Sequence, residues 1–273
     1  MPAARATIDS MLNKRHSKFL TNLQTRHGRK KSDAFIAEGW RCCEEALRRR
    51  PEWLEALFCS AGAQQSPRWP AMAALAAAAG CEPEMLSEQD FAALTDTENP
   101  QGLLCVLKRV ECALPQALAD PFCLILDRVC EPGNLGSILR TAWAVGLHSV
   151  WLIKGCADPY APKVVRAGMG AQFALDLPVF DDLAAAAAHL RQLGGSGLWC
   201  TLPAADTTLF ADAFDLRGCG LVIGNEANGI SHPELGRGVT IPMPGHAESI
   251  NAAQAATVFL FEAVRRGLFT SNP

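Results

Sequence analysis

The sequence predicts an α/β protein with two domains, the second of which contains a parallel β-sheet. Strand-like apolar runs alternate with helix-like segments along the whole chain, which is the pattern of α/β folds. After residue 122 the runs are short and almost continuously apolar, as expected for strands buried on both faces of a parallel sheet. Residues 111–121 contain two prolines and no clear periodicity. We therefore assign 1–110 to a first domain, 111–121 to a linker and 122–273 to a second domain.

The first domain is expected to alternate between helices and strands. In order, we expect a helix over 10–24, a strand over 34–37, a helix from about 40 to 50, a strand over 54–59, an Ala-rich helix after a loop at 66–70, a short strand near 82–86, a helix from Ser87 and a closing strand over 103–107. Asp90 stands in the first turn after Ser87, which is a favourable start for a helix. This alternation indicates a small α/β domain.

The second domain is expected to repeat a strand–helix–strand pattern with longer apolar runs. The expected strands cover 122–126, 150–153, 198–202 and 221–223, and the expected helices cover about 136–145, 162–169 and 181–193. A long last helix follows from about 250 to 267, and we expect Ser249 to cap its amino end.

Composition favours a globular protein of a reducing compartment. Of all residues, 49% are apolar and 19% are charged, which is ordinary for a soluble domain. No apolar run reaches the roughly 18–20 residues that span a bilayer. The 11 cysteines are odd in number, form no Cys-x-x-Cys pair and stand mostly in apolar runs, as small buried hydrophobes do. We therefore expect a cytoplasmic protein without membrane association and without a metal site.

Positive charge is concentrated at the amino end of the chain. Residues 1–50 carry twelve Lys and Arg against five Asp and Glu, although the whole chain has a net charge of −3. Such a segment suits binding to a phosphate backbone, through Lys14, Arg15, Lys18, Arg26, Arg29, Lys30 and Lys31. A solvated surface and a mitochondrial presequence are the alternatives.

Three segments of the second domain hold polar residues that packing alone does not require. The first, 127–142, follows a strand and opens a helix, so its Pro-Gly-Asn-x-Gly turn lies at the carboxyl edge of the sheet, where α/β proteins bind ligands. It contains Asn134 and Arg140. The Arg140 guanidinium suits a phosphate or a developing oxyanion; the alternative is a plain helix start whose arginine faces solvent.

The second segment, 221–231, is an apolar strand that runs into a turn rich in Gly and Asn. It contains Gly224, Asn225 and a single carboxylate at Glu226, and its glycines permit close backbone approaches. The alternative is an ordinary turn at a strand end.

The third segment, 239–251, combines two prolines and Gly245 in an irregular loop that leads to the last helix. Ser249 and Asn251 stand at the helix start; capping by Ser249 explains the serine and leaves Asn251 unexplained.

Together these segments resemble the SpoU (TrmH-type) branch of the knotted SPOUT RNA methyltransferases. The matching pieces are Asn134-x-Gly136-x-x-x-Arg140, Gly224-Asn225-Glu226-x-x-Gly229-Ile230-Ser231, and Ile241-Pro242-Met243-x-Gly245 with Ser249-Ile250-Asn251. Segments 22–47, 97–102 and 162–171 also resemble family members, so the likeness covers nearly the whole chain and leaves little room for a presequence. Two departures are Ile250, where the family more often has Leu, and Ala252-Ala253-Gln254, where Val-Ser-Val is more usual.

The resemblance implies a fold, a cofactor and partners. The second domain would be a SPOUT domain with a deep trefoil knot, preceded by a small ribosomal-protein-like α/β domain that binds RNA. S-adenosylmethionine would be held by Gly224, Asn225, Ile241, Met243, Gly245 and Ile250. The active protein would be a homodimer whose site is completed by the partner chain. Its RNA would be ribosomal RNA, with transfer RNA as the alternative, bound through Arg29, Lys30, Lys31, Lys163 and Arg166.

The implied reaction is methyl transfer to a ribose 2′-hydroxyl, which is a poor nucleophile. We expect Arg140 to stabilise negative charge as it develops on the oxygen, because a guanidinium does not deprotonate in proteins. Glu226 would orient Arg140 or accept the proton. Ser249 and Asn251, together with Asn134, would fix the ribose or the loops of the site.

Two alternatives from other classes remain at this stage. A conventional nucleotide-binding α/β enzyme would carry Gly-x-Gly-x-x-Gly after its first strand or a Gly-x-x-x-x-Gly-Lys-Ser/Thr loop, and the chain has neither. A non-catalytic RNA-binding or ribosome-assembly protein suits the basic amino end. It gives no reason for Arg140, Glu226 and Asn251.

Overall fold

The computed structural model describes residues 17–95, 97 and 99–269 and divides them between two compact units. The first unit comprises residues up to 110 together with 160–173, and the second comprises 111–159 and the residues from 174 onward. Lys14 and Arg15 lie outside the described residues. The prediction that 1–110 and 122–273 are separately folding domains stays a prediction.

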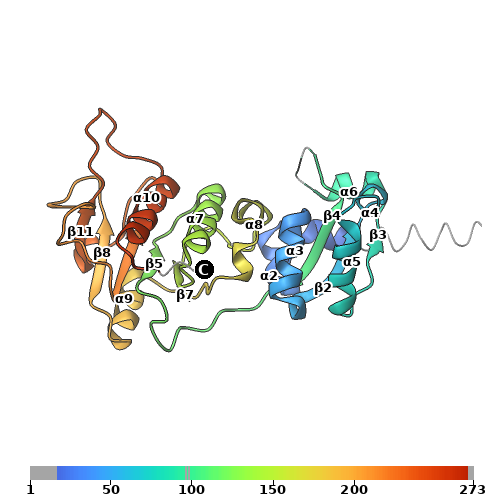
Figure 1. Cartoon of the computed structure of the whole chain (residues 1–273), viewed down its shortest axis with the longest axis horizontal. Coiled ribbons are helices and arrows are strands. Elements are labelled where there is room, and N and C mark those ends of the chain that lie inside the picture. Colours follow the sequence, from blue (N-terminus) through green and yellow to red (C-terminus); the bar gives the residue numbers. More distant parts are fainter. Residues whose placement is uncertain (1–16, 96, 98, 270–273) are drawn as a thin grey trace, which may run out of the picture. The chain divides into compact units, whose positions relative to one another are not determined.

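The first unit is a mixed four-stranded sheet with helices (Figure 1). Its sheet has the order β1-β4-β2-β3, in which β4 is antiparallel to β1 and β2, and β3 is parallel to β2. The strands are β1 (Ala34–Glu38), β2 (Leu54–Cys59), β3 (Glu84–Met85) and β4 (Leu103–Lys108); the helices are α2 (Arg26–Ser32), α3 (Trp40–Arg49), α4 (Ala61–Gln64), α5 (Trp69–Ala78), α6 (Glu88–Leu94) and α8 (Pro162–Gly168). Ser87 caps α6 as expected, since its hydroxyl accepts from the Asp90 N–H.

Segment 160–173 packs in the core of the first unit, although the sequence analysis placed it in the second domain. The rings of Tyr160 and Phe173 lie 4.7 Å and 6.1 Å from the ring of Phe35 in β1. Val165 of α8 belongs to the same buried cluster. The apolar pattern of this segment predicted the helix, but such a pattern does not specify which sheet the helix covers.

The second unit is built on a seven-stranded parallel sheet, which confirms the predicted fold class. The sheet order is β7-β6-β5-β10-β8-β11-β9. Its strands are β5 (Cys123–Leu126), β6 (Val150–Ile153), β7 (Val179–Phe180), β8 (Gly197–Thr201), β9 (Thr207–Thr208), β10 (Cys219–Ile223) and β11 (Arg237–Thr240); its helices are α7 (Pro132–Val145), α9 (Leu183–Gln192) and α10 (Ala252–Arg265). Strands β5 and β10 occupy the centre. The trefoil knot stays a prediction.

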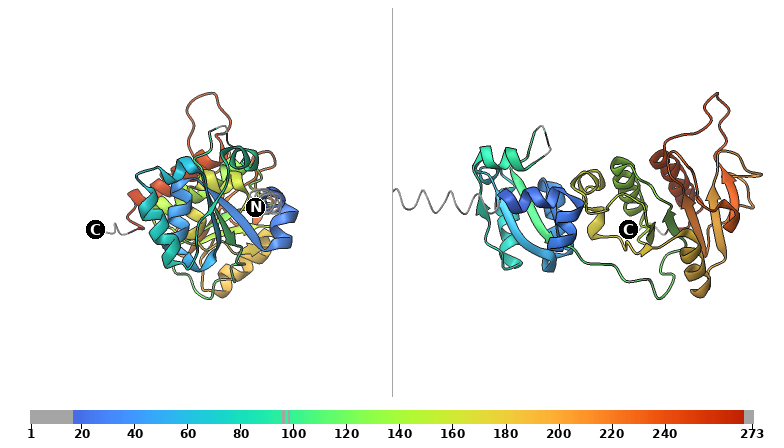
Figure 2. Two further views of the ribbon diagram at one scale, coloured as in Figure 1. Left: turned by 90° about the vertical axis from the view of Figure 1, so that its right-hand side faces the viewer. Right: turned by 180° about the vertical axis from the view of Figure 1, so that it is seen from behind.

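Helices cover the sheet of the second unit. Helix α9 buries Leu183 and Leu190 in the same cluster as Ile125 and Val222 of the central strands. Helices α7 and α10 lie side by side, and the Thr141 and Thr257 hydroxyls lie 3.4 Å apart between them. The loop between β11 and α10 projects away from the sheet (Figure 2). Within the described residues, no helix is both long and apolar enough to cross a membrane.

Candidate active site

The three polar segments of the sequence meet at the carboxyl edge of the parallel sheet. Strands β5 and β10 are neighbours in register, with Leu126 beside Ile223, so the loops that follow them begin side by side. Strands β8 and β11 end at the same edge. Together these loops enclose a cavity of about 500 Å³. The volume lies in the range of roughly 300–1,000 Å³ that is typical of sites for small molecules and cofactors.

Three predicted catalytic residues form a chain of side-chain hydrogen bonds beside this cavity. The Asn134 amide nitrogen in α7 donates to Glu226 Oε1 at 2.9 Å. The Asn251 amide nitrogen donates to Asn134 Oδ1, also at 2.9 Å. Since Glu226 and Asn251 line the cavity, this chain connects all three segments at the edge of the site. Within the described residues, no group of three or more His, Cys, Asp or Glu side chains could hold a metal ion.

The Glu226 carboxylate is held in its ionised form by hydrogen-bond donors. Besides Asn134, the backbone N–H groups of Cys130 and Glu131 donate to it at 3.3 Å and 3.4 Å. Partial burial by itself raises the pKa of a carboxyl, but these donors outweigh it, so the pKa of Glu226 is lowered from its usual value. The group is therefore an anion at neutral pH.

A buried carboxylate lies behind the loops, and it was not among the predicted site residues. Asp127 is fully buried directly after β5, and its Oδ2 accepts from the Ser231 N–H at 2.5 Å. The next residue, Arg128, has a positive φ of 57°. Its carbonyl accepts from the Asn225 amide nitrogen at 2.7 Å. Asp127 and Arg128 thus tie the loop after β5 to the loop after β10. The signal in the sequence was a charged residue at the end of a strictly apolar strand.

Gly224 is required by a close approach of two backbone segments. A Cβ at this position would lie 2.5 Å from the carbonyl carbon of Gly229 and 2.7 Å from the Ile230 nitrogen. This approach closes a tight turn in which Asn225 and Gly229 exchange two backbone hydrogen bonds of 2.9 Å. Any larger residue at 224 would force these two backbone segments apart and disturb the turn that carries Glu226.

The predicted cofactor residues form most of the remaining wall. Gly224, Asn225, Ile241, Met243 and Ile250 all line the cavity, and buried Phe259 of α10 adds an aromatic surface. Gly245 does not line it. An apolar wall with exposed backbone edges suits a cofactor with an adenine ring and an alkyl sulfonium, so the residues present fit S-adenosylmethionine.

Two predicted site residues, Ser249 before α10 and Arg140 on α7, differ in their relation to the cavity. Ser249 lines the cavity but does not cap α10; Asn251 does, since its Oδ1 accepts from the Ala253 and Gln254 N–H groups. The helix begins two residues later than expected, which moves the capping position from 249 to 251. Arg140 is exposed on α7 and is not among the residues that line the cavity.

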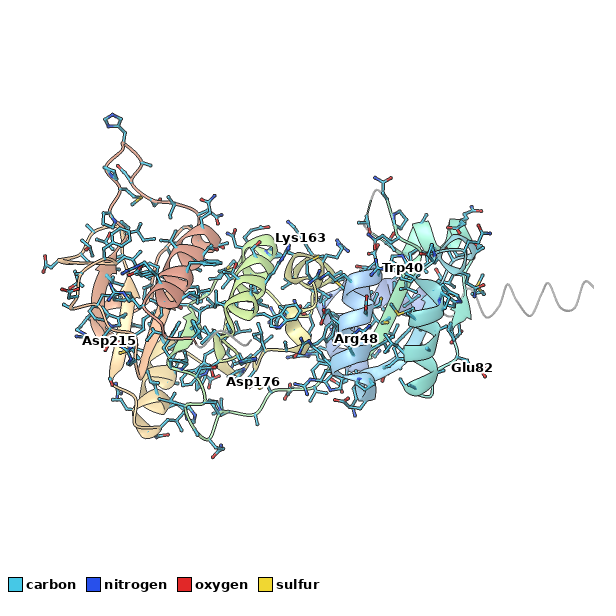
Figure 3. All side chains as sticks on the ribbon, in the orientation of Figure 1. Trp40, Arg48, Glu82, Lys163, Asp176 and Asp215 are labelled. Carbon is cyan, nitrogen blue, oxygen red and sulfur yellow. The ribbon has the colours of Figure 1, made fainter. Side chains whose placement is uncertain are left out.

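The predicted RNA contacts differ in their surroundings. Lys30, Lys31 and Lys163 are exposed, and Figure 3 shows Lys163 on α8. Arg29 is only 3% exposed, because its guanidinium donates to the carbonyls of Leu23 and Gln24 at 2.9 Å. The expectation of a surface contact at Arg29 is therefore wrong: this arginine fixes the turn before α2. Arg166 is half-buried and paired with Glu38 at 3.3 Å.

The fold and the cavity define an α/β protein that binds a small molecule at the carboxyl edge of its parallel sheet. Residues 121–261 match the SpoU rRNA Methylase family, and residues 14–105 match the MRM3-like substrate binding domain. The first match covers more than half of the chain. The chain therefore belongs to the SpoU rRNA methylase family.

Similar proteins of known name or structure agree with this assignment. A Bacillus subtilis protein named 23S rRNA (guanosine(2553)-2′-O)-methyltransferase RlmP is 31% identical over 248 residues, which are 88% of this chain and 92% of that protein. An uncharacterised tRNA/rRNA methyltransferase of Synechocystis is 30% identical over 94% of this chain and 93% of its own. The SpoU methyltransferase AviRb of Streptomyces viridochromogenes, solved with the cofactor AdoMet, superposes with a TM-score of 0.81 at 28% identity, covering 93% of this chain and 98% of its own.

Proposed function

We propose that this protein transfers a methyl group from S-adenosylmethionine to a ribose 2′-hydroxyl of ribosomal RNA. The observation that carries the proposal is the hydrogen-bonded chain of Asn134, Glu226 and Asn251 at the rim of a cofactor-sized cavity. RlmP is named as a 23S rRNA 2′-O-methyltransferase, and AviRb was crystallised with AdoMet, which supports both the substrate and the cofactor.

The cofactor belongs in the cavity lined by Gly224, Ile241, Met243 and Ile250. When bound, it supplies a methyl group that its sulfonium centre activates for displacement. The loops contribute apolar contact and backbone hydrogen bonds, and Gly224 permits the tight turn that forms this wall, because a Cβ there would collide with the backbone of Gly229 and Ile230.

Glu226 positions other groups in this proposal and does not collect the proton. A carboxylate with a lowered pKa is a weak base, and Glu226 already accepts hydrogen bonds from Asn134, Cys130 and Glu131. Its negative charge aligns the Asn134 amide, which in turn aligns Asn251. These amides can then fix the ribose hydroxyl in line with the methyl group, which is the main contribution of positioning to such a reaction.

Arg140 acts on the site of a second copy of the chain in this proposal. Its side chain is exposed, and its neighbour Thr141 contacts Thr257 of α10. The outer face of α10 exposes three apolar side chains, Val258, Phe261 and Val264, of which Phe261 is 55% exposed. An apolar helix face of this kind suits a homodimer interface. The dimer would bring Arg140 of one copy to the cavity of the other, where its charge stabilises the developing oxyanion.

Mixing two variants that are each impaired in turnover tests the shared site. Arg140→Ala and Glu226→Gln would be mixed, partly unfolded together and refolded. In a mixed dimer, one site would combine Glu226 of the first chain with Arg140 of the second, so about a quarter of wild-type activity should return. If both groups act within one chain, no mixture regains activity and the shared site is wrong. The cytoplasm as the place of action remains an expectation.

Two measurements test the proposed function as a whole. Titration calorimetry of the pure protein should detect S-adenosylmethionine binding, with or without RNA. Mapping of 2′-O-methylated nucleotides in ribosomal RNA should reveal one that disappears in a deletion strain and returns with the wild-type gene. Absence of binding at millimolar cofactor would sink the enzyme hypothesis. If the deletion strain keeps every ribosomal RNA methyl group and lacks one in transfer RNA, the substrate is transfer RNA and not ribosomal RNA.

A further inference from the structure

The first unit contains a second polar cavity that the methyl-transfer chemistry does not use. It has a volume of about 190 Å³, and its lining comes from the end of β1 and start of α3, the segment before β4, and α8. These are three of the segments in which the sequence resembles family members outside the catalytic motifs. Polar side chains gathered from three separate segments are not needed for packing a small sheet.

The buried carboxylate of this cavity is already satisfied. Glu38, only 8% exposed at the end of β1, accepts a hydrogen bond from the Thr97 hydroxyl on one oxygen. Its other oxygen accepts from Arg166 Nη1 at 3.3 Å. The Glu38 and Arg166 charges therefore cancel, and the pair fixes the wall of the cavity between β1 and α8.

The mouth of the cavity is shaped by Gly39 and Gln101. Gly39 has a φ of 89°, and a Cβ there would lie 3.0 Å from Gln101 Oε1. The same Gln101 oxygen accepts from the Trp40 N–H at 3.0 Å, at the first residue of α3. The Gln101 NH2 group is left as a donor beside the cavity.

Two side chains of the cavity lining are exposed to solvent. Arg41 and Asn99 both line the cavity, and neither side chain makes a hydrogen bond or ion pair with another residue in the described part of the chain. Among the described residues, the cavity therefore presents one cation without a charged partner, the Asn99 amide with both donor and acceptor, and the Gln101 donor. This set matches a phosphate next to a planar group with a hydrogen-bonding edge.

We propose that this cavity receives one unpaired nucleotide of the RNA. Its volume lies below that of drug-sized sites, so it admits one base and excludes a duplex. Unpaired bases are what proteins read in RNA, through amide groups at the base edge and arginine at the backbone. Asn99 and Gln101 face the base edge, and Arg41 contacts the adjoining phosphate. The inference rests on RNA being the substrate, as proposed above.

Full-length protein and labelled RNAs test this site by fluorescence anisotropy. The probes are single-stranded RNAs of about ten nucleotides with mixed sequence, and a duplex of the same strand, measured over a series of salt concentrations. Arg41→Ala should weaken single-strand binding roughly tenfold and reduce the salt slope by about one, because one phosphate contact is lost. Asn99→Ala should weaken it by a similar factor with an unchanged salt slope, and should reduce the preference among bases.

The matched control is Arg48→Ala, which removes the same charge from the same helix. Arg48 lies at the end of α3 opposite Trp40 and pairs with Glu44 (Figure 3). It should change binding by less than roughly twofold. Equal losses in Arg48→Ala and Arg41→Ala, or duplex binding as strong as single-strand binding, overturn the nucleotide site. Cofactor binding and melting temperature are measured on every variant to exclude misfolding.

Failure of this site is distinguishable from failure of the proposed function. If wild-type protein methylates ribosomal RNA and the Arg41 and Asn99 variants bind RNA normally, the nucleotide site alone is wrong. If no methylation occurs but single-strand binding still depends on Arg41 and Asn99, the site stands and the reaction is wrong. If this cavity binds a peptide and does not bind RNA, the proposal is also overturned.

Discussion

The two cavities of this protein use their polar side chains in opposite ways. In the second unit, Asn134, Glu226 and Asn251 bond to one another and are fixed before any ligand arrives. In the first unit, Glu38 is fixed by hydrogen bonds from Thr97 and Arg166, whereas Arg41 and Asn99 are open to solvent. A site for chemistry needs groups whose positions are set in advance, whereas a site that captures flexible RNA benefits from groups that can adjust. The difference between the cavities matches these two tasks.

The largest expected effect comes from Arg140, the proposed catalytic cation, which lies outside the hydrogen-bonded chain of Asn134, Glu226 and Asn251. Arg140→Ala should lower turnover by roughly a hundredfold, about 3 kcal/mol, by analogy with the loss of one oxyanion donor. Arg140→Lys should not restore full activity, because an ammonium lacks the planar guanidinium fork. The measurement is single-turnover methylation of the identified RNA.

Cofactor affinity and melting temperature measured on the same Arg140 preparations separate catalysis from binding. Both should stay near wild type, since Arg140 is exposed and is not part of the cavity lining. Near-normal turnover in Arg140→Ala, or activity lost only through weaker cofactor binding, would remove Arg140 from the mechanism.

Breaking the fixed network at its centre should have the next largest effect. Glu226→Gln keeps the shape but removes the charge that orders Asn134 and the Cys130 and Glu131 N–H groups. We expect turnover to fall roughly tenfold, which corresponds to about 1.4 kcal/mol and is close to the contribution of one hydrogen bond to a charged group. Activity of wild type should also fall as pH drops through the lowered pKa of Glu226, and Glu226→Gln should lack that fall. If the activity of Glu226→Gln still falls at low pH, the titration of another group causes that fall.

Asp127 tests whether the network depends on the support behind it. Asp127→Asn removes a charged acceptor from the Ser231 N–H in a fully buried position, which should cost about 1–3 kcal/mol of stability. Because Asp127 touches neither cavity directly, turnover should fall only a few-fold while the KM for RNA stays unchanged. Denaturant melts and steady-state kinetics measure the two quantities. An undiminished stability would show that the loop after β10 needs no such anchor.

The sequence predicted the elements and chemistry that depend on local patterns. Strands β2 and β6 and the Ser87 cap were predicted correctly, because apolar runs and capping residues act over a few positions. These predictions needed no knowledge of long-range packing. A shared site for Asn134, Glu226 and Asn251 was expected from the family resemblance, and in the structure their side chains form one hydrogen-bonded chain.

Other features depend on contacts between distant segments and were not predictable in this way. In the sequence, Arg29 looks like any other residue of a basic run, and its burial follows from hydrogen bonds to carbonyls such as those of Leu23 and Gln24. The packing of segment 160–173 on β1, and the exposure of Arg140 away from the cavity, are equally invisible in spacing. Asp127 was missed because a strand-end carboxylate has no motif of its own.

The smallest expected effect concerns Glu262, a carboxylate of the second unit that is as well bonded as Glu226 but lies away from the cavity lining. It accepts from Arg265 and Arg266 at 2.6 Å, and Arg266 also donates to the carbonyls of Leu209 and Phe214. The hydrogen bonds from Arg265 come first among the causes that lower the pKa of Glu262, to about 2, against the opposing effect of burial.

A lowered folded-state pKa stabilises the protein above the ordinary pKa of a glutamate, and this contribution is lost as pH falls toward about 2. At neutral pH, Glu262→Gln should therefore lower stability by about 1 kcal/mol, or about 2–4 °C in Tm. The gap from wild type should shrink as pH falls from about 4 to about 2, because protonated Glu262 then resembles glutamine. Calorimetric melts over this pH range measure the gap, and methylation at neutral pH should be unchanged. A gap that is constant with pH would mean that the Arg265 and Arg266 contacts contribute through packing. A loss of turnover would mean that hydrogen bonding alone does not distinguish the catalytic carboxylate, Glu226, from the structural one, Glu262.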